Sequence, residues 1–213
     1  MIEIFVKGGP VMWPLLLTSI VTLGVVIDRL WFIFQERRSR QPEVVDAILE
    51  KLEAGETESA VEAGTGSTDF VARTLTYALT HRNTSISQAI LRSAALELKR
   101  FGRGLPVLDT VITLAPLLGL LGTVTGMIRS FGLLGTSELG APMAITGGIA
   151  EALIATAFGL GIAIAALLPF NYLNARQEEA RHEIEDATAQ LELLLVKCSG
   201  GTCLLRNLDP VHA

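Results

Sequence analysis

The sequence contains few of the side chains that metal sites and catalysis use most. Of its 213 residues, two are cysteines and three are histidines. Cys198 and Cys203 lie close together near the end of the chain without a histidine beside them, whereas structural zinc takes four ligands. His81, His182 and His212 are scattered, and we expect them at the surface. The sequence therefore predicts no metal site and no cofactor.

Charged residues are also scarce, and familiar catalytic motifs are missing. They make up 18% of the chain, against roughly 25% in soluble domains. The net charge of −5, with no basic patch interleaved with aromatics, excludes a nucleic-acid binder. The chain has no Walker A, GxGxxG, HExxH, CxxC or GxSxG pattern. We therefore expect a protein that is not an enzyme.

The sequence instead contains long runs of hydrophobic residues. Half of the residues are hydrophobic, and they gather in three blocks at 11–34, 105–134 and 142–171. Each block reaches the roughly 20 residues that span a bilayer, whereas a soluble core would scatter them at amphipathic spacing. The first block has no basic leader and no small-residue cleavage site, so we interpret it as a retained helix and not a signal peptide. The fold class predicted is an all-α integral membrane protein with three transmembrane helices.

The distribution of Lys and Arg predicts the orientation of these helices. Segment 35–104 carries ten of them, the loop 135–141 none, and the tail 172–213 four. Because cytoplasmic loops carry the excess of basic residues, the N-terminus 1–10 and the loop 135–141 are expected to be periplasmic. Segment 35–104 and the tail are then cytoplasmic. Reduced, free thiols are expected in that tail, with redox pairing or palmitoylation as the alternative.

The cytoplasmic segments have helical patterns. Pro42 suits the first turn of a helix, and Ser85 or Ser87 can cap another. We expect helices at 42–54, 58–63, 70–81 and from Ser85 or Ser87 onward, with a linker at 64–69. Transmembrane helices two and three are expected to extend into the cytoplasm. The extension of the third has heptad-like apolar positions, which pack on the 35–104 helices or on a neighbouring subunit: Leu173, Ala180, Ile184, Ala187, Leu191 and Leu194.

Glu151 is the only ionisable residue between Ile149 and Leu168. A charged side chain at the centre of a membrane helix costs about 2.5–3.5 kcal/mol, so such residues mark ion paths or partner contacts by default. The alternative is a protonated acid hydrogen-bonded between helices. No cation lies near Glu151 in its own span, and apolar surroundings disfavour its charged form.

The second block carries polar residues along one line. Steps of four and three join Asp109, Thr113, Thr123 and Ser130 through apolar positions, which follows one seam of a helix. The seam indicates a side that faces a polar space or another helix, although each hydroxyl can instead bond its own helix. Small residues in the third block, and Gly119, Gly122 and Gly126 in the second, favour close helix packing. Arg129 is expected to reach the outer interface.

Thr156 lies on the same helix as Glu151 but about 140° around it. The two side chains therefore cannot share a narrow stripe. One is expected to face a central space and the other a subunit boundary, and the spacing does not assign which.

Two stretches carry a resemblance to a known family. Residues 114–131 (LAPLLGLLGTVTGMIRSF) and 148–160 (GIAEALIATAFGL) resemble the MotA/TolQ/ExbB proton-channel family, and its ExbB and TolQ branches in particular. The resemblance implies a homopentamer around a central pore in the bacterial inner membrane. It also implies that Glu151 is the acidic pore residue, with Thr123 and Thr156 as the pore threonines. Thr125 departs from the pattern, since ExbB and TolQ commonly carry Trp there.

The resemblance further implies partners. A dimer of an ExbD- or TolR-like single-span protein, whose aspartate titrates, would lie inside the pentamer, and a TonB- or TolA-like protein would receive the work. Proton flow would drive relative rotation and so power TonB-dependent import, a Tol–Pal envelope function or gliding at the outer membrane. The ion, proton or sodium, is not fixed by the residues. Two alternatives are a structural scaffold for partner helices and a flagellar-type stator, which usually has four spans.

Overall fold

The computed structural model describes residues 5, 7–134 and 141–199, and all regular structure in this part of the chain is helical. The chain divides into two compact units. Met1–Leu30 and Gly104–Asn174 form the first, called the apolar unit here, and Trp31–Arg103 and Ala175–Ala213 form the second, the polar unit. Residues 135–140 of the expected periplasmic loop, Cys203 and the side chain of Cys198 lie outside the described residues.

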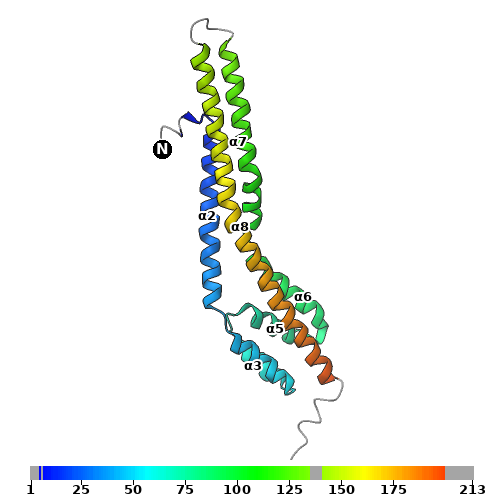
Figure 1. The fold of residues 1–213 in the computed structure, drawn as a ribbon. Helices are drawn as coiled ribbons and strands as arrows, with labels where there is room; N and C mark the ends of the chain where they lie inside the picture. Colours follow the sequence, from blue (N-terminus) through cyan, green and yellow to red (C-terminus); the bar gives the residue numbers. More distant parts are fainter. Residues whose placement is uncertain (1–4, 6, 135–140, 200–213) are drawn as a thin grey trace, which may run out of the picture. The chain divides into compact units, whose positions relative to one another are not determined.

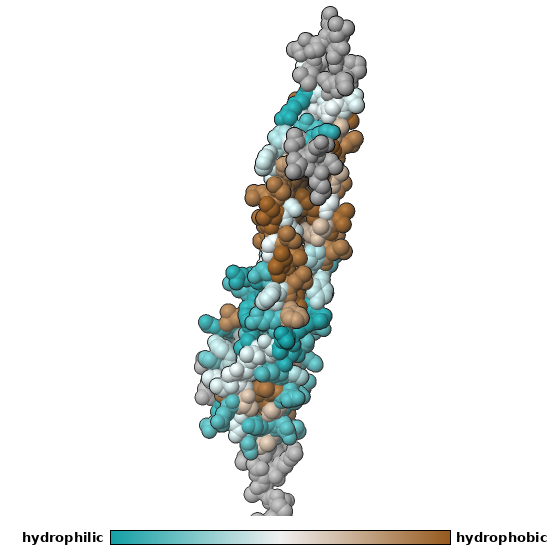
Figure 2. Space-filling model, turned by 90° about the vertical axis from the view of Figure 1, so that its left-hand side faces the viewer, coloured by the Kyte–Doolittle hydropathy of each residue, from teal (hydrophilic) through white to brown (hydrophobic). Residues whose placement is uncertain are grey.

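The apolar unit is built from three long helices that run side by side (Figure 1). They belong to α2 (Met12–Arg38), α7 (Leu105–Leu134) and α8 (Ala141–Ser199). All three are long and apolar enough to cross a membrane. Large hydrophobic side chains cover the outside of this unit, among them Trp13, Ile128 and Leu168 at 67%, 66% and 70% exposed (Figure 2). Such a surface suits contact with lipid or neighbouring helices, as expected for a membrane protein.

Small residues set the contact between α7 and α8. A Cβ atom on Gly119 would lie 3.0 Å from Thr156 Cα, and one on Gly122 would lie 2.5 Å from Ala155 Cβ. A Cβ atom on Gly159 would lie 2.5 Å from the carbonyl oxygen of Ala115. The two backbones therefore approach closely because side chains are missing at the contact. The predicted close-approach role of Gly119 and Gly122 is confirmed.

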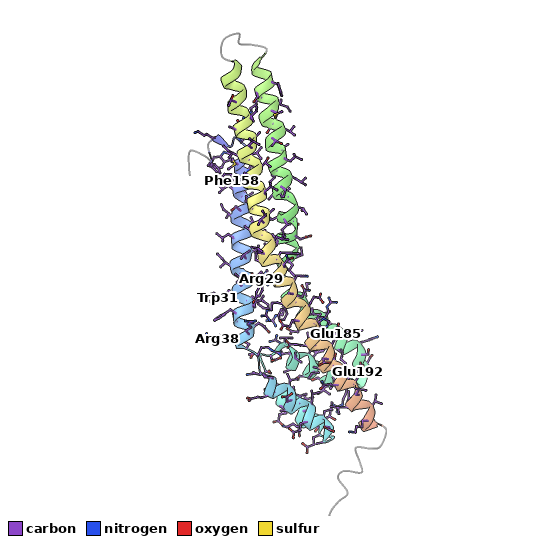
Figure 3. All side chains as sticks on the ribbon, in the orientation of Figure 1. Arg29, Trp31, Arg38, Phe158, Glu185 and Glu192 are labelled. Carbon is purple, nitrogen blue, oxygen red and sulfur yellow. The ribbon has the colours of Figure 1, made fainter. Side chains whose placement is uncertain are left out.

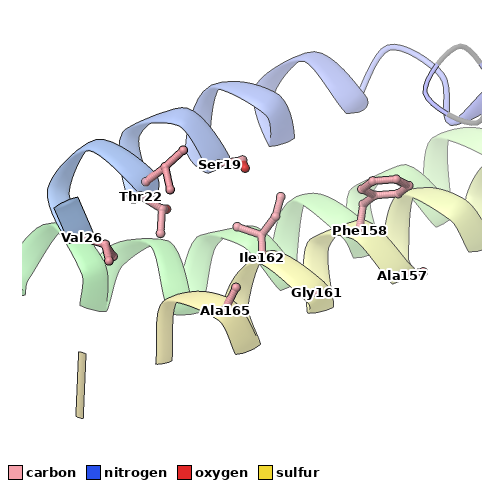
Figure 4. A pocket seen from close by; sticks show the side chains of 9 residues that line it. Ser19, Thr22, Val26, Ala157, Phe158, Gly161, Ile162 and Ala165 are labelled. Carbon is pink, nitrogen blue, oxygen red and sulfur yellow. The ribbon is translucent and has the colours of Figure 1, made fainter. Parts of the chain in front are cut away.

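A groove of about 550 Å³ lies between α2 and α8 (Figure 4). Ser19, Thr22 and Val26 line one wall, and Phe158 and Gly161 line the other. The Thr22 hydroxyl donates to the Thr18 carbonyl of its own helix at 2.7 Å. Because no ionisable side chain lines this groove, it does not provide the acid that an ion site in a membrane needs.

The polar unit contains α3 (Pro42–Glu53), α4 (Thr57–Gly64), α5 (Phe70–Thr80) and α6 (Arg82–Phe101). The helices expected here from the sequence are confirmed within a few residues. The helical backbone of α6 is interrupted at Ser85, whose φ of −171° and ψ of 106° are extended, and the Ser85 hydroxyl accepts from Gln88 N at 3.5 Å. Ser85 therefore starts a new helical stretch, as predicted for one of the two candidate caps.

The core of the polar unit includes the end of α8. Ala180, Ile184, Ala187 and Leu191 are buried in one cluster with residues such as Leu75 of α5. The polar face of the same helix carries Glu185 and Glu192, which are exposed (Figure 3). Of the two partners predicted for this heptad-like face, the 35–104 helices are therefore the one it contacts within the chain.

Asp69 joins several segments of the polar unit. Its carboxylate is fully buried and accepts from Val71 N at 2.8 Å and Ala72 N at 3.4 Å, which caps α5. It also accepts from Gln41 N at 2.8 Å and from Arg40 Nη1 at 3.0 Å. The expected linker 64–69 thus ends in a structural acid, because a buried carboxylate is stable only when its oxygens are hydrogen-bonded.

Glu36 is a second buried acid of the polar unit, two residues beyond the apolar block 11–34. Glu36 lies 3.7 Å from Arg73 Nη2, and its buried Oε1 lacks a hydrogen-bond partner among the described residues. Arg73 instead donates to Glu97 at 2.8 Å and 3.0 Å. Burial raises the pKa of Glu36, although the positive charges of Arg100 and Arg73 oppose the shift. Burial likewise raises the pKa of Glu183, against the opposing charge of Arg40.

Candidate ion pathway

Glu151 lies on α8 within the apolar unit, and its side chain is 23% exposed. Arg129 of α7 donates from Nη1 to Glu151 Oε1 at 3.0 Å. The sequence correctly places no cation beside Glu151 in its own span, but the neighbouring helix supplies one. Arg129 therefore pairs with an acid instead of simply reaching for the outer interface, and the two charges compensate each other where water is scarce.

The segment before α2 also contacts Glu151. Gly9 has a φ of +72°, and a Cβ atom there would lie 1.8 Å from Glu151 Oε1 and 2.7 Å from its Cδ. Gly8, one residue earlier, packs in the same way against Met12 and Ile154. The carboxylate thus lies against a stretch of backbone that only glycine allows, because a side chain would be strained at this φ and would occupy the place of the carboxylate.

Thr156 bonds across the helix contact. Its hydroxyl lies 3.0 Å from the Gly119 carbonyl of α7 and 3.2 Å from the Ala152 carbonyl of its own helix. Thr123, in contrast, donates to Leu120 of its own helix at 2.6 Å. Glu151 and Thr156 therefore both contact α7 within one chain, at Arg129 and at Gly119, and both stay partly exposed.

The polar seam on α7 is only partly open. Asp109 and Thr113 are exposed and Thr123 is partly buried, whereas Ser130 is 2% exposed and packs where α8 has Gly148. Thr113 donates to Thr110 O at 2.9 Å and Ser130 to Gly126 O at 3.0 Å, both within the helix. A hydroxyl that donates to its own helix still has lone pairs to accept from water or a hydrated proton. The exposed hydroxyls can therefore accept hydrogen bonds from other groups, while their own protons are donated to carbonyl oxygens of the same helix.

Arg129 and Gly9 are the two residues of this site that were not predicted from the sequence. A signal for Arg129 exists, because it is the one basic residue in 105–134 and Glu151 is the one acid in 149–168. No comparable signal marks Gly9, whose contact depends on where the N-terminal segment folds back. Among the described residues, no group of three or more His, Cys, Asp or Glu side chains could hold a metal ion.

Three apolar helices with an acid held at their contact define a multi-pass membrane protein with a polar site inside its apolar part. The family model of the MotA/TolQ/ExbB proton channel family matches residues 62–186, more than half of the chain. The chain belongs to this family. The family is one of channel and transport subunits and not a class of enzymes.

Similar proteins agree with this assignment. The chain is 39% identical to the putative biopolymer transport protein ExbB-like 1 of Synechocystis, over 91% of this chain and 78% of the relative. It is 29% identical to the biopolymer transport protein ExbB of Neisseria meningitidis, over 91% of this chain and 96% of the relative. It is 40% identical to the Tol-Pal system protein TolQ of Pseudomonas aeruginosa over a shorter region, 44% of this chain and 40% of the relative. A role of the proton-channel, biopolymer-transport type follows.

Proposed function

We propose that this chain is the stator subunit of an inner-membrane motor driven by the proton-motive force. A homopentamer surrounds a dimer of an ExbD- or TolR-like single-span protein, and ion flow between them turns one against the other. The motor then does work on the outer membrane through a TonB- or TolA-like protein. The observation that carries the proposal is Glu151, an acid inside the apolar unit that is paired with the half-exposed Arg129.

The proposed topology places the polar unit in the cytoplasm. Segment 35–104 holds ten of the basic residues, and the periplasmic loop 135–141 holds none. Trp31 and Arg38 project from α2 (Figure 3), with Trp31 73% exposed, as interfacial aromatics and basic residues do at the inner membrane boundary. In this arrangement the N-terminal segment that contacts Glu151 lies toward the periplasm.

Glu151, Thr123 and Thr156 are the proposed ion-pathway residues. Five copies of Glu151 would form a ring of acids that gates or polarises the path, while the partner's aspartate carries the proton. Thr123 offers acceptor lone pairs, and Thr156 fixes the distance between α7 and α8 through its bond to Gly119. Asp109 and Thr113, exposed on the same face of α7, extend the polar lining.

Single substitutions test the ion-path role. We expect Glu151→Ala, Thr123→Ala and Thr156→Ala to abolish energy-dependent activity, measured as motor-dependent growth or import, while membrane insertion and oligomer size stay unchanged. Thr125→Ala is a matched control, since its hydroxyl also bonds its own helix, at 2.9 Å to Leu121 O. Full activity in all three variants would refute the proposal.

The second candidate is a structural scaffold that organises partner helices without ion conduction. It is favoured by the glycine contacts and by hydroxyls that bond their own helices. It predicts that pathway substitutions lower activity only in proportion to lost assembly. A flagellar-type stator remains a lesser candidate, because three helices and not four are able to span a membrane in the described part of the chain.

The gene neighbourhood would identify the process. A neighbouring gene for a small single-span protein with an aspartate near the start of its span would support the motor. A TonB-like gene beside it would indicate import, and a Pal-like gene would indicate the Tol–Pal envelope function.

A further inference from the structure

We propose that Arg129 and Gly9 form a latch: together they hold the Glu151 carboxylate in one position until a partner helix binds and replaces Arg129. This inference rests on the proposed ion-path role of Glu151 and adds its regulation. Arg129 acts as a positioning residue, since it contacts the acid and not the moving ion. Gly9 supplies the backbone surface against which the carboxylate is held.

The first observation is the geometry of the charged pair. Arg129 Nη1 lies 3.0 Å from Glu151 Oε1, and no other hydrogen bond to the Glu151 carboxylate is found among the described residues. A guanidinium remains charged in proteins, so the acid has a fixed counter-ion on the adjacent helix. The Arg129 side chain is 55% exposed and Glu151 is 23% exposed. The pair is therefore close enough to hold the acid yet open enough for another group to replace Arg129.

The second observation is independent of charge. The Gly9 backbone, at a φ of +72°, leaves room for the carboxylate where an alanine Cβ would lie 1.8 Å from Oε1. Gly9 O also accepts from Met12 N at 3.2 Å, which connects this turn to the start of α2. The N-terminal segment thus limits where the Glu151 carboxylate can move, while Arg129 donates a hydrogen bond to one of its two oxygens.

The latch keeps Glu151 paired with Arg129 while no partner helix is present. While Arg129 holds Glu151, the guanidinium occupies one site on Oε1 and the side chain stays against Gly9, so a partner must compete with Arg129 to draw the carboxylate away. A partner that offers Glu151 a hydrogen bond of similar strength releases it from Arg129. A conformational change of this kind needs a partner that binds the released state better than the latched one.

The test is the proton leak of the full-length chain in liposomes without a partner, followed with a pH-sensitive dye. Loss of one charge-assisted hydrogen bond should raise the leak of Arg129→Gln about tenfold over the native chain. Arg129→Lys should stay as tight as the native chain, because the observed contact uses a single nitrogen and a lysine can replace it. Arg181→Gln is the matched control, since Arg181 is an exposed arginine near Glu178 on the same long helix as Glu151, outside the apolar unit.

A double variant separates the latch from general damage. Arg129→Gln combined with Glu151→Gln should be as tight as the native chain, because no carboxylate remains to be released. Gly9→Ala should leak like Arg129→Gln, whereas Gly24→Ala, where a Cβ atom meets nothing within 4 Å, should not. A tight Arg129→Gln variant, a leaking Arg129→Lys variant, or a double variant that leaks as much as the single would each overturn the latch.

The partner-dependent assay of Glu151→Ala distinguishes the two possible failures. If Glu151→Ala keeps full energy-dependent activity, the proposed ion-path role of Glu151 is wrong whatever the leak shows. If Glu151→Ala is inactive and Arg129→Gln stays tight, the ion path stands and only the latch is wrong.

Discussion

The two units each hold an acid in a low-polarity place, and they hold it in opposite ways. Asp69 of the polar unit is completely buried and accepts from three backbone N–H groups and Arg40. Glu151 of the apolar unit is partly exposed, and one half-exposed guanidinium donates to it. Asp69 is thereby fixed as part of the fold. Glu151 is held by a single half-exposed donor, which suits the ion-path role proposed for it.

The two units also differ in the side chains that pack them together. The polar unit buries large side chains such as Ile48, Leu52 and Leu79, as a unit stabilised by exclusion of water should. The apolar unit brings α7 and α8 together through Gly119, Gly122 and their partners. In lipid there is little hydrophobic gain between helices, so close backbone contact and a few polar bonds must stabilise them.

The largest expected effect on stability is that of substituting Asp69. Asp69→Ala removes the cap of α5 and the buried partner of Arg40, and should lower the stability of the polar unit by about 3 kcal/mol. Glu151→Ala should leave the stability of the polar unit unchanged, because its side chain lies in the apolar unit. Hydrogen–deuterium exchange of α5 amides in the detergent-solubilised chain measures the first effect. Equal loss of protection in both variants would contradict the contrast.

The next effect concerns the glycine contact of the apolar unit. Gly159→Ala forces a Cβ atom to 2.5 Å from Ala115 O, and should cost about 1–3 kcal/mol as the helices separate. Gly161→Ala, on the same helix with nothing within 4 Å, is the matched control. Thermal midpoints of the two variants in one detergent give the comparison. Similar midpoints would show that α7 and α8 do not pack as described.

A smaller effect separates the two threonines of the proposed path. Thr156→Val loses a bond between helices, whereas Thr123→Val loses one within a helix. Interhelical hydrogen bonds in membranes contribute about 0.6 kcal/mol on average, so Thr156→Val should be the less stable variant by about that amount. Thermal midpoints measured side by side decide this. The reverse order would mean that Thr156 does not hold α7.

The smallest effect is a pH dependence at Glu36. Its pKa is raised by burial above the ordinary value of 4.5, so the folded chain binds this proton more tightly than the unfolded chain. Stability from the protonated carboxyl is thus complete below pH 4.5 and is lost as pH rises through the raised pKa. Glu36→Gln should therefore gain about 0.5 kcal/mol over the native chain at neutral pH and nothing at low pH.

Exposed Glu192 provides the control for that measurement, since Glu192→Gln removes the same charge from a side chain that is not buried. Urea or thermal unfolding at pH values from below 4.5 up to neutral follows the difference. A Glu36→Gln variant that is less stable than the native chain at neutral pH would mean that the attraction of Arg73 and Arg100 outweighs the burial of the acid.

Periodicity and breaker residues were enough to predict the helices. The apolar face from Ala180 to Leu191 repeats every three or four residues, and it is buried as its spacing indicated. Pro42 and Ser85 marked the starts of helices, because proline restricts the local backbone and serine caps it. These are short-range properties, which a sequence carries directly.

The hydrogen-bond partners of Asp69 and Glu151 could not be predicted from the sequence. Asp69 looked like part of a linker, and its contacts to Gln41 and Arg40 join residues about 28 positions apart. The sequence places no cation near Glu151 in its own span, and the pairing with Arg129 of the neighbouring helix depends on the register of α7 against α8. That register follows from glycine contacts that no single helix pattern specifies. Ser130, placed on the seam by spacing, is buried because the same register sets it against Gly148.

The most direct test of the account is proton flux through the chain reconstituted together with its single-span partner. We predict that Glu151→Ala stops the partner-dependent flux while the complex keeps its size and composition. Asp69→Asn, which leaves the apolar unit intact, should keep flux per assembled complex. Persistent flux in Glu151→Ala at the native level would contradict the claim that this acid gates or polarises the ion path.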